Sequence, residues 1–170
     1  AALDRTNAYG KTKAISENIV KASHMDYVIL RPAFIYGKGS KVFDMMAACI
    51  RKYPFIPVVG HGRGKLQPVY VDDICDIIVK LAGYKARNKT YYLAGEQKIS
   101  LNELIDKIAF LYSKKVIKIH IPLWLLWLPL KLYSLIIKNS QVNYESLMLL
   151  NQDKTCDIAE IKNDFNFLPK

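Results

Sequence analysis

Apolar side chains recur every three or four residues in several stretches of this chain, a spacing that predicts amphipathic helices. Shorter apolar or alternating runs lie between these stretches, and such runs predict strands. The predicted helices cover residues 6–23, 41–53, 72–83, 100–111 and a C-terminal segment within 153–169. The predicted strands cover residues 27–30, 90–95 and 116–121, and residues 54–59 form a further apolar segment.

Several residues predict where these helices begin and which side they bury. Ser100 and Glu103 have the spacing of a capping box at the start of the helix of residues 100–111. Gly83 can end the preceding helix of residues 72–83. Asp72 or Asp73 is expected to cap the helix that ends at Gly83, an interpretation that we favour over a catalytic role. The first helix has apolar residues available for its buried side, namely Ala8, Ile15, Ile19, Val20 and Ala22.

The first predicted helix carries Tyr9 and Lys13, which are four residues apart. Side chains at this spacing emerge on the same face, one turn apart. A cation beside a phenol favours the phenolate and lowers the pKa of tyrosine from its usual value near 10, which suits a general acid or base at neutral pH. Such a pair on a solvated helix is usually inert, and an ion pair of Lys13 with Glu17 is the structural alternative. Spacing alone therefore leaves both interpretations open.

Three further motifs follow Tyr9-x-x-x-Lys13, at residues 28–37 (Val-Ile-Leu-Arg-Pro-Ala-Phe-Ile-Tyr-Gly), 59–64 (Val-Gly-His-Gly-Arg-Gly) and 67–74 (Gln-Pro-Val-Tyr-Val-Asp-Asp-Ile). This order, with the closing Asp-Phe-Asn-Phe-Leu-Pro of residues 164–169, resembles the C-terminal portion of the extended short-chain dehydrogenase/reductase superfamily, the nucleotide-sugar epimerases and dehydratases. In that family the first βαβ unit carries a Gly-rich dinucleotide fingerprint, which would lie upstream of residue 1. Because the chain also opens without a Met, we interpret residue 1 as a cut through a longer protein.

The resemblance implies an α/β protein with an incomplete Rossmann-type, NAD(P)-binding fold: its C-terminal strands and helices plus a small α/β substrate lobe. Residues 1–59 would form the C-terminal part of the cofactor domain. Residues 60–170 would be mostly substrate-binding lobe, with one helix at about 72–83 and a strand at about 90–94 returning to the cofactor part. The implied cofactor is NAD or NADP, and its binding is expected to need the missing N-terminal part.

The resemblance also implies roles for individual residues. Tyr9 would be the catalytic acid/base, and Lys13 would lower its pKa and hydrogen-bond the nicotinamide ribose. Pro32 would pack against the nicotinamide at the carboxyl end of its strand. The implied reaction is hydride exchange between a nicotinamide and a nucleotide-sugar carbinol, and the fragment alone is expected to be inactive. A homodimer formed through the helix of residues 6–23 is a further implication.

Contacts to the nucleotide sugar are implied for a glycine-rich loop. Gly60, Gly62, Arg63 and Lys65 could admit a phosphate closely, and in the resembled family this region lines the nucleotide-diphosphate pocket. Arg31 is a further implied substrate contact. A flexible hairpin is an equal alternative for the loop. It is not a Walker A sequence, because Lys65 is followed by Leu rather than Ser or Thr.

The motif after this loop departs from the sugar-epimerase pattern. Leu66 stands where many such enzymes have a phosphate-binding Arg. The Gln-Pro-Val form of residues 67–69 resembles atypical members similar to the accessory subunit of respiratory complex I, which bind a dinucleotide without known turnover. A non-catalytic dinucleotide-binding scaffold, peripheral to a membrane, is therefore the alternative function.

Composition limits the class of protein. The chain has 170 residues, 51% of them hydrophobic and 24% charged, which predicts a globular domain. Its formal charge of +10 would attract phosphates, nucleic acid or an anionic membrane. No nucleic-acid recognition motif accompanies the charge, so we predict no nucleic-acid partner. Cys49, Cys75 and Cys156 lack metal-ligand spacing, which predicts no metal site and favours thiols in a reducing, cytoplasmic location.

Residues 122–137 concentrate apolar side chains, with Trp124 and Trp127, between prolines and lysines. The segment is too short and too interrupted for a transmembrane helix. We favour a helix buried in the small lobe or at an oligomer contact, and the alternative is peripheral contact with a membrane interface. Six lysines and no acidic residue lie between Asp106 and Glu145.

Overall fold

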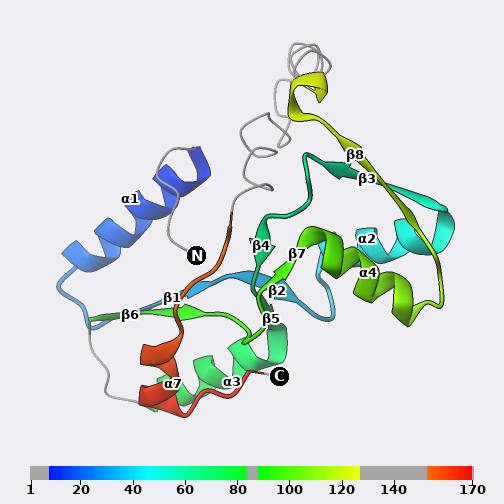
Figure 1. Ribbon diagram of the computed structural model, residues 1–170. Coiled ribbons are helices and arrows are strands. Elements are labelled where there is room, and N and C mark those ends of the chain that lie inside the picture. The colour runs from blue at the N-terminus through cyan, green and yellow to red at the C-terminus, as the bar shows by residue number, and fades with distance from the viewer. Residues whose placement is uncertain (1–7, 84–87, 127–152, 170) are drawn as a thin grey trace. The chain divides into compact units, whose positions relative to one another are not determined.

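The computed structural model of this protein describes residues 8–83, 88–126 and 153–169 (Figure 1). The chain divides into two compact units. Unit 1 consists of residues 1–38, 67–98 and 154–170, and unit 2 consists of residues 39–66 and 99–153. Residues 39–59, which the sequence placed with the cofactor part, thus fall in unit 2, because α2 (Lys41–Lys52) packs against α4 (Leu101–Leu111) and β3 (Phe55–Val59) pairs with β8 (Ile117–Ile121).

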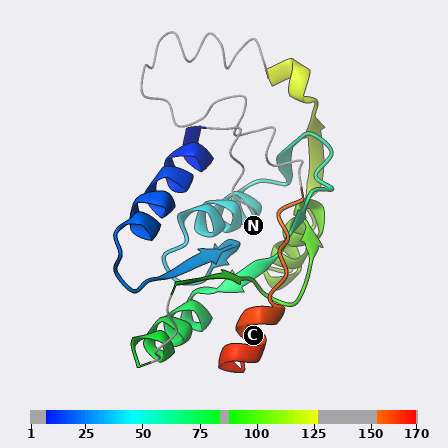
Figure 2. The ribbon, with the colours of Figure 1, turned by 90° about the vertical axis from the view of Figure 1, so that its left-hand side faces the viewer.

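Unit 1 is built on two pairs of parallel strands. Its elements are α1 (Ala8–Ala22), β1 (Val28–Pro32), β2 (Phe34–Tyr36), β5 (Pro68–Tyr70), α3 (Val71–Ala82), β6 (Lys89–Leu93) and α7 (Ala159–Phe165). Strand β1 pairs with β6, and β2 pairs with β5. Helix α1 lies on one side of the strands, and α3 and α7 lie on the other (Figures 1 and 2). Helices on both sides of parallel strands confirm the predicted α/β class.

The core of unit 1 lies between its strands and the α3/α7 side. Tyr91 and Leu93 of β6 are fully buried there, and Tyr91 meets Phe165 of α7 edge to face, with 5.5 Å between ring centroids. The other buried members of this core are Val69, Ile74, Ile77, Ala94, Ile158, Ile161 and Phe167. Helix α7 therefore closes a core whose strands come from much earlier in the chain.

Helix α1 meets the sheet through a face that the sequence did not predict. Ile15 and Ile19, expected on the buried side, are 60% and 66% exposed, and that expectation is wrong for them. The least exposed described positions are Gly10, Ala14 and Glu17, which are spaced by four and three residues. The face of α1 that meets the strands thus consists of the small residues Gly10 and Ala14, together with Glu17, which pairs with Arg31 of β1.

The helix starts were predicted with mixed success. The capping box of α4 is confirmed, since Ser100 Oγ accepts from the Glu103 N–H at 3.1 Å and Glu103 Oε2 accepts from the Ser100 N–H at 2.6 Å. The predicted Asp cap of α3 is wrong, because the N-cap is Tyr70, without a side-chain hydrogen bond. Asp72 and Asp73 lie inside the first turn instead, where carboxylates interact favourably with the helix dipole.

Unit 2 contains α2, α4, the parallel pair β3/β8, and a short antiparallel pair of β4 (Lys65–Leu66) and β7 (Ile99–Ser100). Strands β4, β5 and β7 have only two or three residues each, too few for a two-residue hydrophobic period to be recognised in the sequence. Ile56 and Val58 of β3 are buried together with Ile50 of α2 and Leu104, Ile105 and Ile108 of α4.

Only part of the segment 122–137 falls within the described residues. Residues 123–126 form one helical turn, and Trp124 and Leu125 on it are 73% and 53% exposed, so they are not buried in the small lobe. Residues 127–137 lie outside the described part. In the ranges that the structure describes, no helix combines the length and apolarity needed to cross a bilayer.

Unfolding of this protein should become easier as the pH rises above about 10. Burial, followed by a 2.5 Å hydrogen bond to Asp164, raises the pKa of Tyr91 to about 12. A group with a raised folded pKa contributes stability that is present below its unfolded pKa and is lost as the pH approaches the folded value. Urea unfolding of the wild type and of Tyr91→Phe should therefore show a shallower alkaline loss in the variant. Equal slopes for the two proteins would contradict the assignment.

Candidate functional site

The structure confirms that Tyr9 and Lys13 share helix α1, one turn apart, with Tyr9 in its first turn. Lys13 is exposed. The same helix carries Glu17 one turn further on, and Glu17 is turned toward the strands of unit 1. The roles of Tyr9 and Lys13 as acid/base and cofactor ligand stay predictions.

Arg31 joins α1 to the carboxyl end of β1. Its Nε and Nη2 donate to the two carboxylate oxygens of Glu17 at 2.8 and 2.5 Å, and its Nη1 donates to the Tyr92 hydroxyl at 2.5 Å. The side chains of Arg31 and Glu17 are only 19% and 14% exposed. The hydrogen bond to Glu17 is the main cause that raises the pKa of Arg31 above its usual value. A bidentate, largely buried pair of this kind fixes the position of the helix on the strand. Arg31 therefore serves first as an anchor of α1, and its predicted substrate contact stays a prediction.

Glu17→Gln should lower the free energy of unfolding by about 1–2 kcal/mol, because the Arg31 charge loses its carboxylate partner in a largely desolvated place. The matched control is Glu96→Gln, which removes the carboxylate of the Glu96–Lys162 ion pair, where the Glu96 side chain is 59% exposed. An exposed pair is worth about 0.2–1 kcal/mol, so the control should change stability less. Urea denaturation followed by circular dichroism measures both. An equal or larger effect at Glu96 would contradict the anchoring role of Arg31.

The carboxyl ends of β2 and β5 bring two tyrosines together. The rings of Tyr36 and Tyr70 are 5.4 Å apart, and Gly37 leaves room for them, because a Cβ there would lie 2.9 Å from Tyr70 Cε2. Burial and then the charge of Asp73 raise the pKa of Tyr36, whereas the charge of Asp72 is the main cause that raises the pKa of Tyr70. Both phenols therefore stay protonated at neutral pH. Sequence reasoning missed this pair as site residues. The available signal was the placement of each Tyr near the end of a short apolar run, one residue before Gly37 and two residues before Asp72.

The glycine-rich loop is held tightly within unit 2. Gly60 and Gly62 have φ of 70° and 62°, which favours glycine, and a Cβ at Gly62 would lie 2.5 Å from Asn102 Oδ1. The N–H groups of Gly60, Arg63 and Lys65 already donate to Ile121 O, His61 Nδ1 and Asp153 Oδ1 at 2.8, 3.0 and 2.8 Å.

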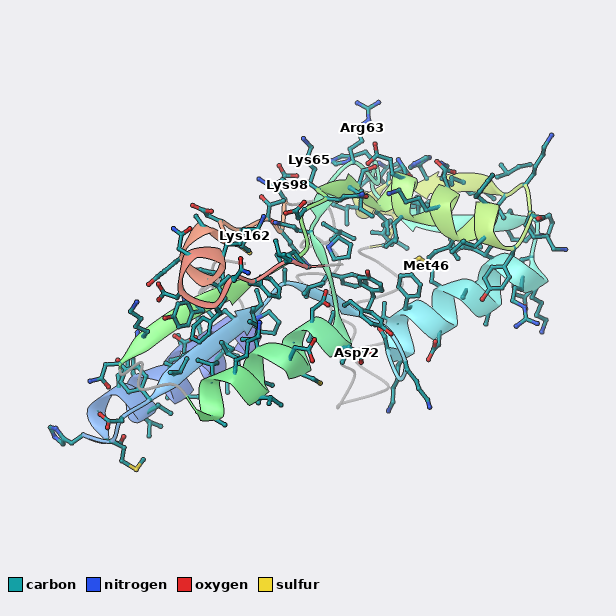
Figure 3. The ribbon with its side chains drawn as sticks, turned by 90° about the horizontal axis from the view of Figure 1, so that it is seen from below. Met46, Arg63, Lys65, Asp72, Lys98 and Lys162 are labelled. Atoms are coloured by element: carbon teal, nitrogen blue, oxygen red, sulfur yellow. The ribbon has the colours of Figure 1, made fainter. Side chains whose placement is uncertain are left out.

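Those three N–H groups are therefore not available to donate to a phosphate, as the predicted phosphate contact of this loop would need. The side chains of Arg63 and Lys65 are exposed and can supply positive charge, and Figure 3 shows Arg63 extending away from the ribbon.

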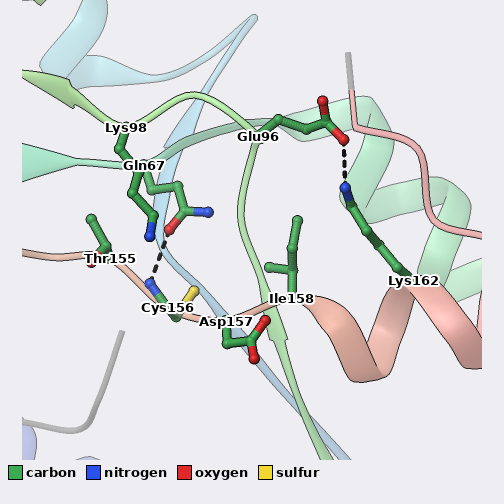
Figure 4. Close-up of a pocket in the computed structure, with 8 residues that line it drawn as sticks. All are labelled: Gln67, Glu96, Lys98, Thr155, Cys156, Asp157, Ile158 and Lys162. Carbon is green, nitrogen blue, oxygen red and sulfur yellow. Dashed lines mark hydrogen bonds and ion pairs between the residues drawn. The ribbon is translucent and has the colours of Figure 1, made fainter.

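A polar pocket of about 400 Å³ lies within unit 1 (Figure 4). Its lining residues are Gln67, Glu96, Lys98, Thr155, Cys156, Asp157, Ile158 and Lys162. Gln67 is 3% exposed and bridges the pocket wall: its Nε2 donates to Gly95 O at 2.7 Å, and its Oε1 accepts from the Cys156 N–H at 2.9 Å. Lys162 pairs with Glu96. Both amide atoms of Gln67 are thus used by the fold, which gives the Gln-Pro-Val motif a structural role. Within the described ranges, no three His, Cys, Asp or Glu side chains form a group that could hold a metal ion.

Known proteins match this chain over part of their length. Residues 2–119 match the family of the RmlD substrate binding domain. The mitochondrial NADH dehydrogenase (ubiquinone) 1 alpha subcomplex subunit 9 of Arabidopsis thaliana is 33% identical over 100 residues, which are 56% of this chain and 24% of that protein. The UDP-glucose 4-epimerase of Vibrio cholerae is 27% identical over 122 residues, which are 68% of this chain and 37% of that protein. This chain therefore spans well under half of either relative.

Solved structures agree with the fold. A dTDP-glucose 4,6-dehydratase from Bacillus anthracis, solved in complex with NAD, superposes with a TM-score of 0.72 at 16% identity, over 96% of this chain and 47% of that chain. Other similar structures are complexes with NAD or with NADP. The predicted Rossmann-type fold is thus confirmed, with about half of the neighbours' length represented. Since the family match covers more than half of the residues, the chain belongs to the RmlD substrate binding domain family, within the epimerases, dehydratases and reductases of the short-chain dehydrogenase/reductase superfamily.

Proposed function

We propose that this chain is the C-terminal part of an NAD(P)-dependent nucleotide-sugar epimerase, dehydratase or reductase, in which Tyr9 and Lys13 form the acid/base pair. The observation that carries the proposal is the presence of both residues on α1, inside the region that matches the RmlD family. The Vibrio relative is an epimerase and the Bacillus neighbour a dehydratase, which supports this class of reaction.

The residues of unit 1 fit a nicotinamide dinucleotide at the carboxyl ends of the parallel strands, where open α/β sheets bind ligands. Lys13 is exposed on α1, and Pro32 is exposed at the last position of β1. Both positions are therefore accessible to a ligand from solvent. The printed sequence has no Gly-x-Gly-x-x-Gly fingerprint, so the pyrophosphate would be held by residues outside it.

The proposed chemistry assigns one proton transfer to this chain. A bound nicotinamide supplies the hydride acceptor or donor. Tyr9, as phenolate, takes the proton of the carbinol hydroxyl while the carbinol carbon loses its hydride and becomes a ketone carbon, and it returns the proton in the reverse direction. The Lys13 ammonium favours the phenolate form. Tyr36 and Tyr70, whose pKa values are raised, serve as hydrogen-bonding groups and not as bases.

Substrate phosphates would meet cationic side chains. Arg63 and Lys65 are exposed on the glycine-rich loop and fit a diphosphate as charged donors. Gly60 and Gly62 shape the loop that carries them. Arg31 supports the site mainly by holding α1 on β1 through its pair with Glu17.

A non-catalytic dinucleotide-binding scaffold is the second candidate. Leu66, which stands at the position of a phosphate-binding Arg in many sugar epimerases, is 6% exposed. The 33% identity to the Arabidopsis NADH dehydrogenase subunit also favours this candidate. Both candidate functions require binding of a nicotinamide dinucleotide, and only the enzyme would convert a nucleotide sugar.

The proposal is tested by titrating NADH and NADPH into this chain and into the full protein with its upstream residues, following nicotinamide fluorescence. We expect saturable binding by the full protein and weak or no binding by the chain alone. Turnover of UDP- or dTDP-hexoses by the full protein would separate the enzyme from the scaffold. If neither the full protein nor this chain bound NADH or NADPH, both candidate functions would be overturned.

A further inference from the structure

The parallel pair β3/β8 of unit 2 has two chemically different faces. Successive side chains of a strand point to opposite faces, so Ile56, Val58, Lys118 and His120 share one face. This inner face is turned toward α4: Lys118 Nζ donates to Asp106 at 2.6 Å, and His120 Nε2 lies 3.2 Å from Asn102 Oδ1. Figure 1 shows α2 and α4 on the same side of the pair.

The opposite face carries only apolar side chains. Phe55 lies beside Ile117 and Pro57 beside Ile119 in the strand register. Phe55, Ile117 and Ile119 are 49%, 70% and 48% exposed, and Pro57 is exposed as well. We call these four residues the outer face. Apolar side chains that are paired in register and open to solvent are unusual on a soluble surface, and contiguous patches of this kind mark interaction sites.

The two ends of the outer face differ in composition. Both strands enter it from basic segments, Arg51-Lys52 at the end of α2 and Lys114-Lys115 before β8. The Ile117 N–H donates to Pro54 O at 2.9 Å, which holds these two entries side by side. At the other end, β8 runs into the helical turn of residues 123–126, where Trp124 is 73% exposed.

The charge around the outer face has one sign. Residues 45–71 and 107–126, which supply β3, β8 and their flanks, contain lysines and arginines and no Asp or Glu. A partner with an acidic, fluid surface and an apolar interior matches a basic rim around apolar side chains. An exposed Trp beside such a rim is typical of side chains that lie at the level of lipid headgroups. These charges disfavour a second copy of this basic surface, because like charges would meet.

We propose that the outer face of β3/β8, with Trp124 at one end and Lys114-Lys115 at the other, binds the surface of an anionic lipid bilayer. Phe55, Ile117 and Ile119 enter the headgroup region, and the basic residues contact the anionic headgroups. This inference concerns unit 2 alone and does not depend on the nicotinamide chemistry proposed for unit 1.

The test is flotation of the full 170-residue chain with vesicles of phosphatidylcholine alone, or with about 30% phosphatidylserine. We expect binding to the anionic vesicles, and a loss of about tenfold in the partition coefficient for Ile117→Thr/Ile119→Thr, which replaces an ethyl group by a hydroxyl at each position but keeps β-branching. The control is Ile78→Thr/Val79→Thr on α3, whose residues are 52% and 73% exposed in unit 1. Lys114→Gln/Lys115→Gln should lose about tenfold, whereas Lys11→Gln/Lys21→Gln should not.

A second measurement tests whether Trp124 enters the bilayer. In the Trp127→Phe variant, Trp124 is the one Trp of the chain, and brominated acyl chains should quench its fluorescence. The proposal is overturned if the folded chain does not float with anionic vesicles, if the control pairs lose binding as much as the test pairs, or if vesicles bind without quenching. Self-association in the absence of vesicles that Ile117→Thr/Ile119→Thr abolishes would assign the outer face to a second copy and also overturn it. Circular dichroism checks that each variant is folded.

Discussion

The Tyr9→Phe variant of the full protein should turn over nucleotide sugar about 10²–10⁴-fold more slowly than the wild type, because the variant lacks the hydroxyl that exchanges the substrate proton. The ring is kept, so binding of NADH should change little. Steady-state rates with UDP- and dTDP-hexoses, together with NADH titrations, measure the two effects separately.

The matched control for this variant is Tyr27→Phe. Tyr27 is half-buried and lies between α1 and β1, where its backbone carbonyl accepts from the Asn88 N–H at 2.8 Å. Loss of its hydroxyl leaves that backbone bond intact, so the rate should stay near that of the wild type. A Tyr9→Phe protein as active as Tyr27→Phe would remove Tyr9 from the chemistry. If the wild-type full protein bound NADH but did not turn over any of these nucleotide sugars, the non-catalytic dinucleotide-binding scaffold would be favoured.

Gly95→Ala should cost about 3 kcal/mol or more of the free energy of unfolding, the upper range for overpacking a core. A Cβ at Gly95 would lie 2.0 Å from the carbonyl oxygen of Pro68, which is backbone and cannot swing aside. The same carbonyl accepts from the Gly95 N–H at 3.0 Å, so the link between β5 and the end of β6 would break. Thermal and urea unfolding followed by circular dichroism measure the effect.

Gly83→Ala is the control for this change. Gly83 ends α3 with φ of −97°, and the nearest atom to an added Cβ is the Lys80 carbonyl oxygen at 4.0 Å. Alanine fits there without strain and restricts the unfolded chain, so stability should stay equal or rise by up to about 1 kcal/mol. Similar losses at Gly95 and Gly83 would show that the close approach of the Pro68 carbonyl does not determine the outcome.

Local signals in the sequence predicted what depends on neighbouring residues. The capping box at Ser100, the end of α3 at Gly83 and the strand leading into Arg31-Pro32 are each decided within a few positions, and the structure has them. The order of four motifs identified the superfamily. Tyr9 and Lys13 were placed on one helix because helical spacing needs no tertiary information.

Features set by distant residues were not predictable in this way. The two carboxylate oxygens of Glu17 bind Arg31, a contact that the sequence did not predict because only the packing of α1 on β1 brings the two residues near. Gln67 looked like a departure from a substrate motif, and its amide instead bridges Gly95 and Cys156. The exposed stripe of Ile15 and Ile19 has the same periodicity as a buried one, so periodicity cannot tell which of two faces meets the sheet.

The arrangement of unit 1 sets an order of events during synthesis. Strand β1 ends at Pro32, but α7, which supplies Ile161 and Phe165 to the same core, begins only at Ala159. At ribosomal rates of 5–20 residues per second, roughly 6–25 s pass before that core can be closed. Until then the apolar faces of β1 and α3 lack their last helix. Both strands of the β3/β8 pair are synthesised before the interval ends, so this pair can form before the core of unit 1 is complete.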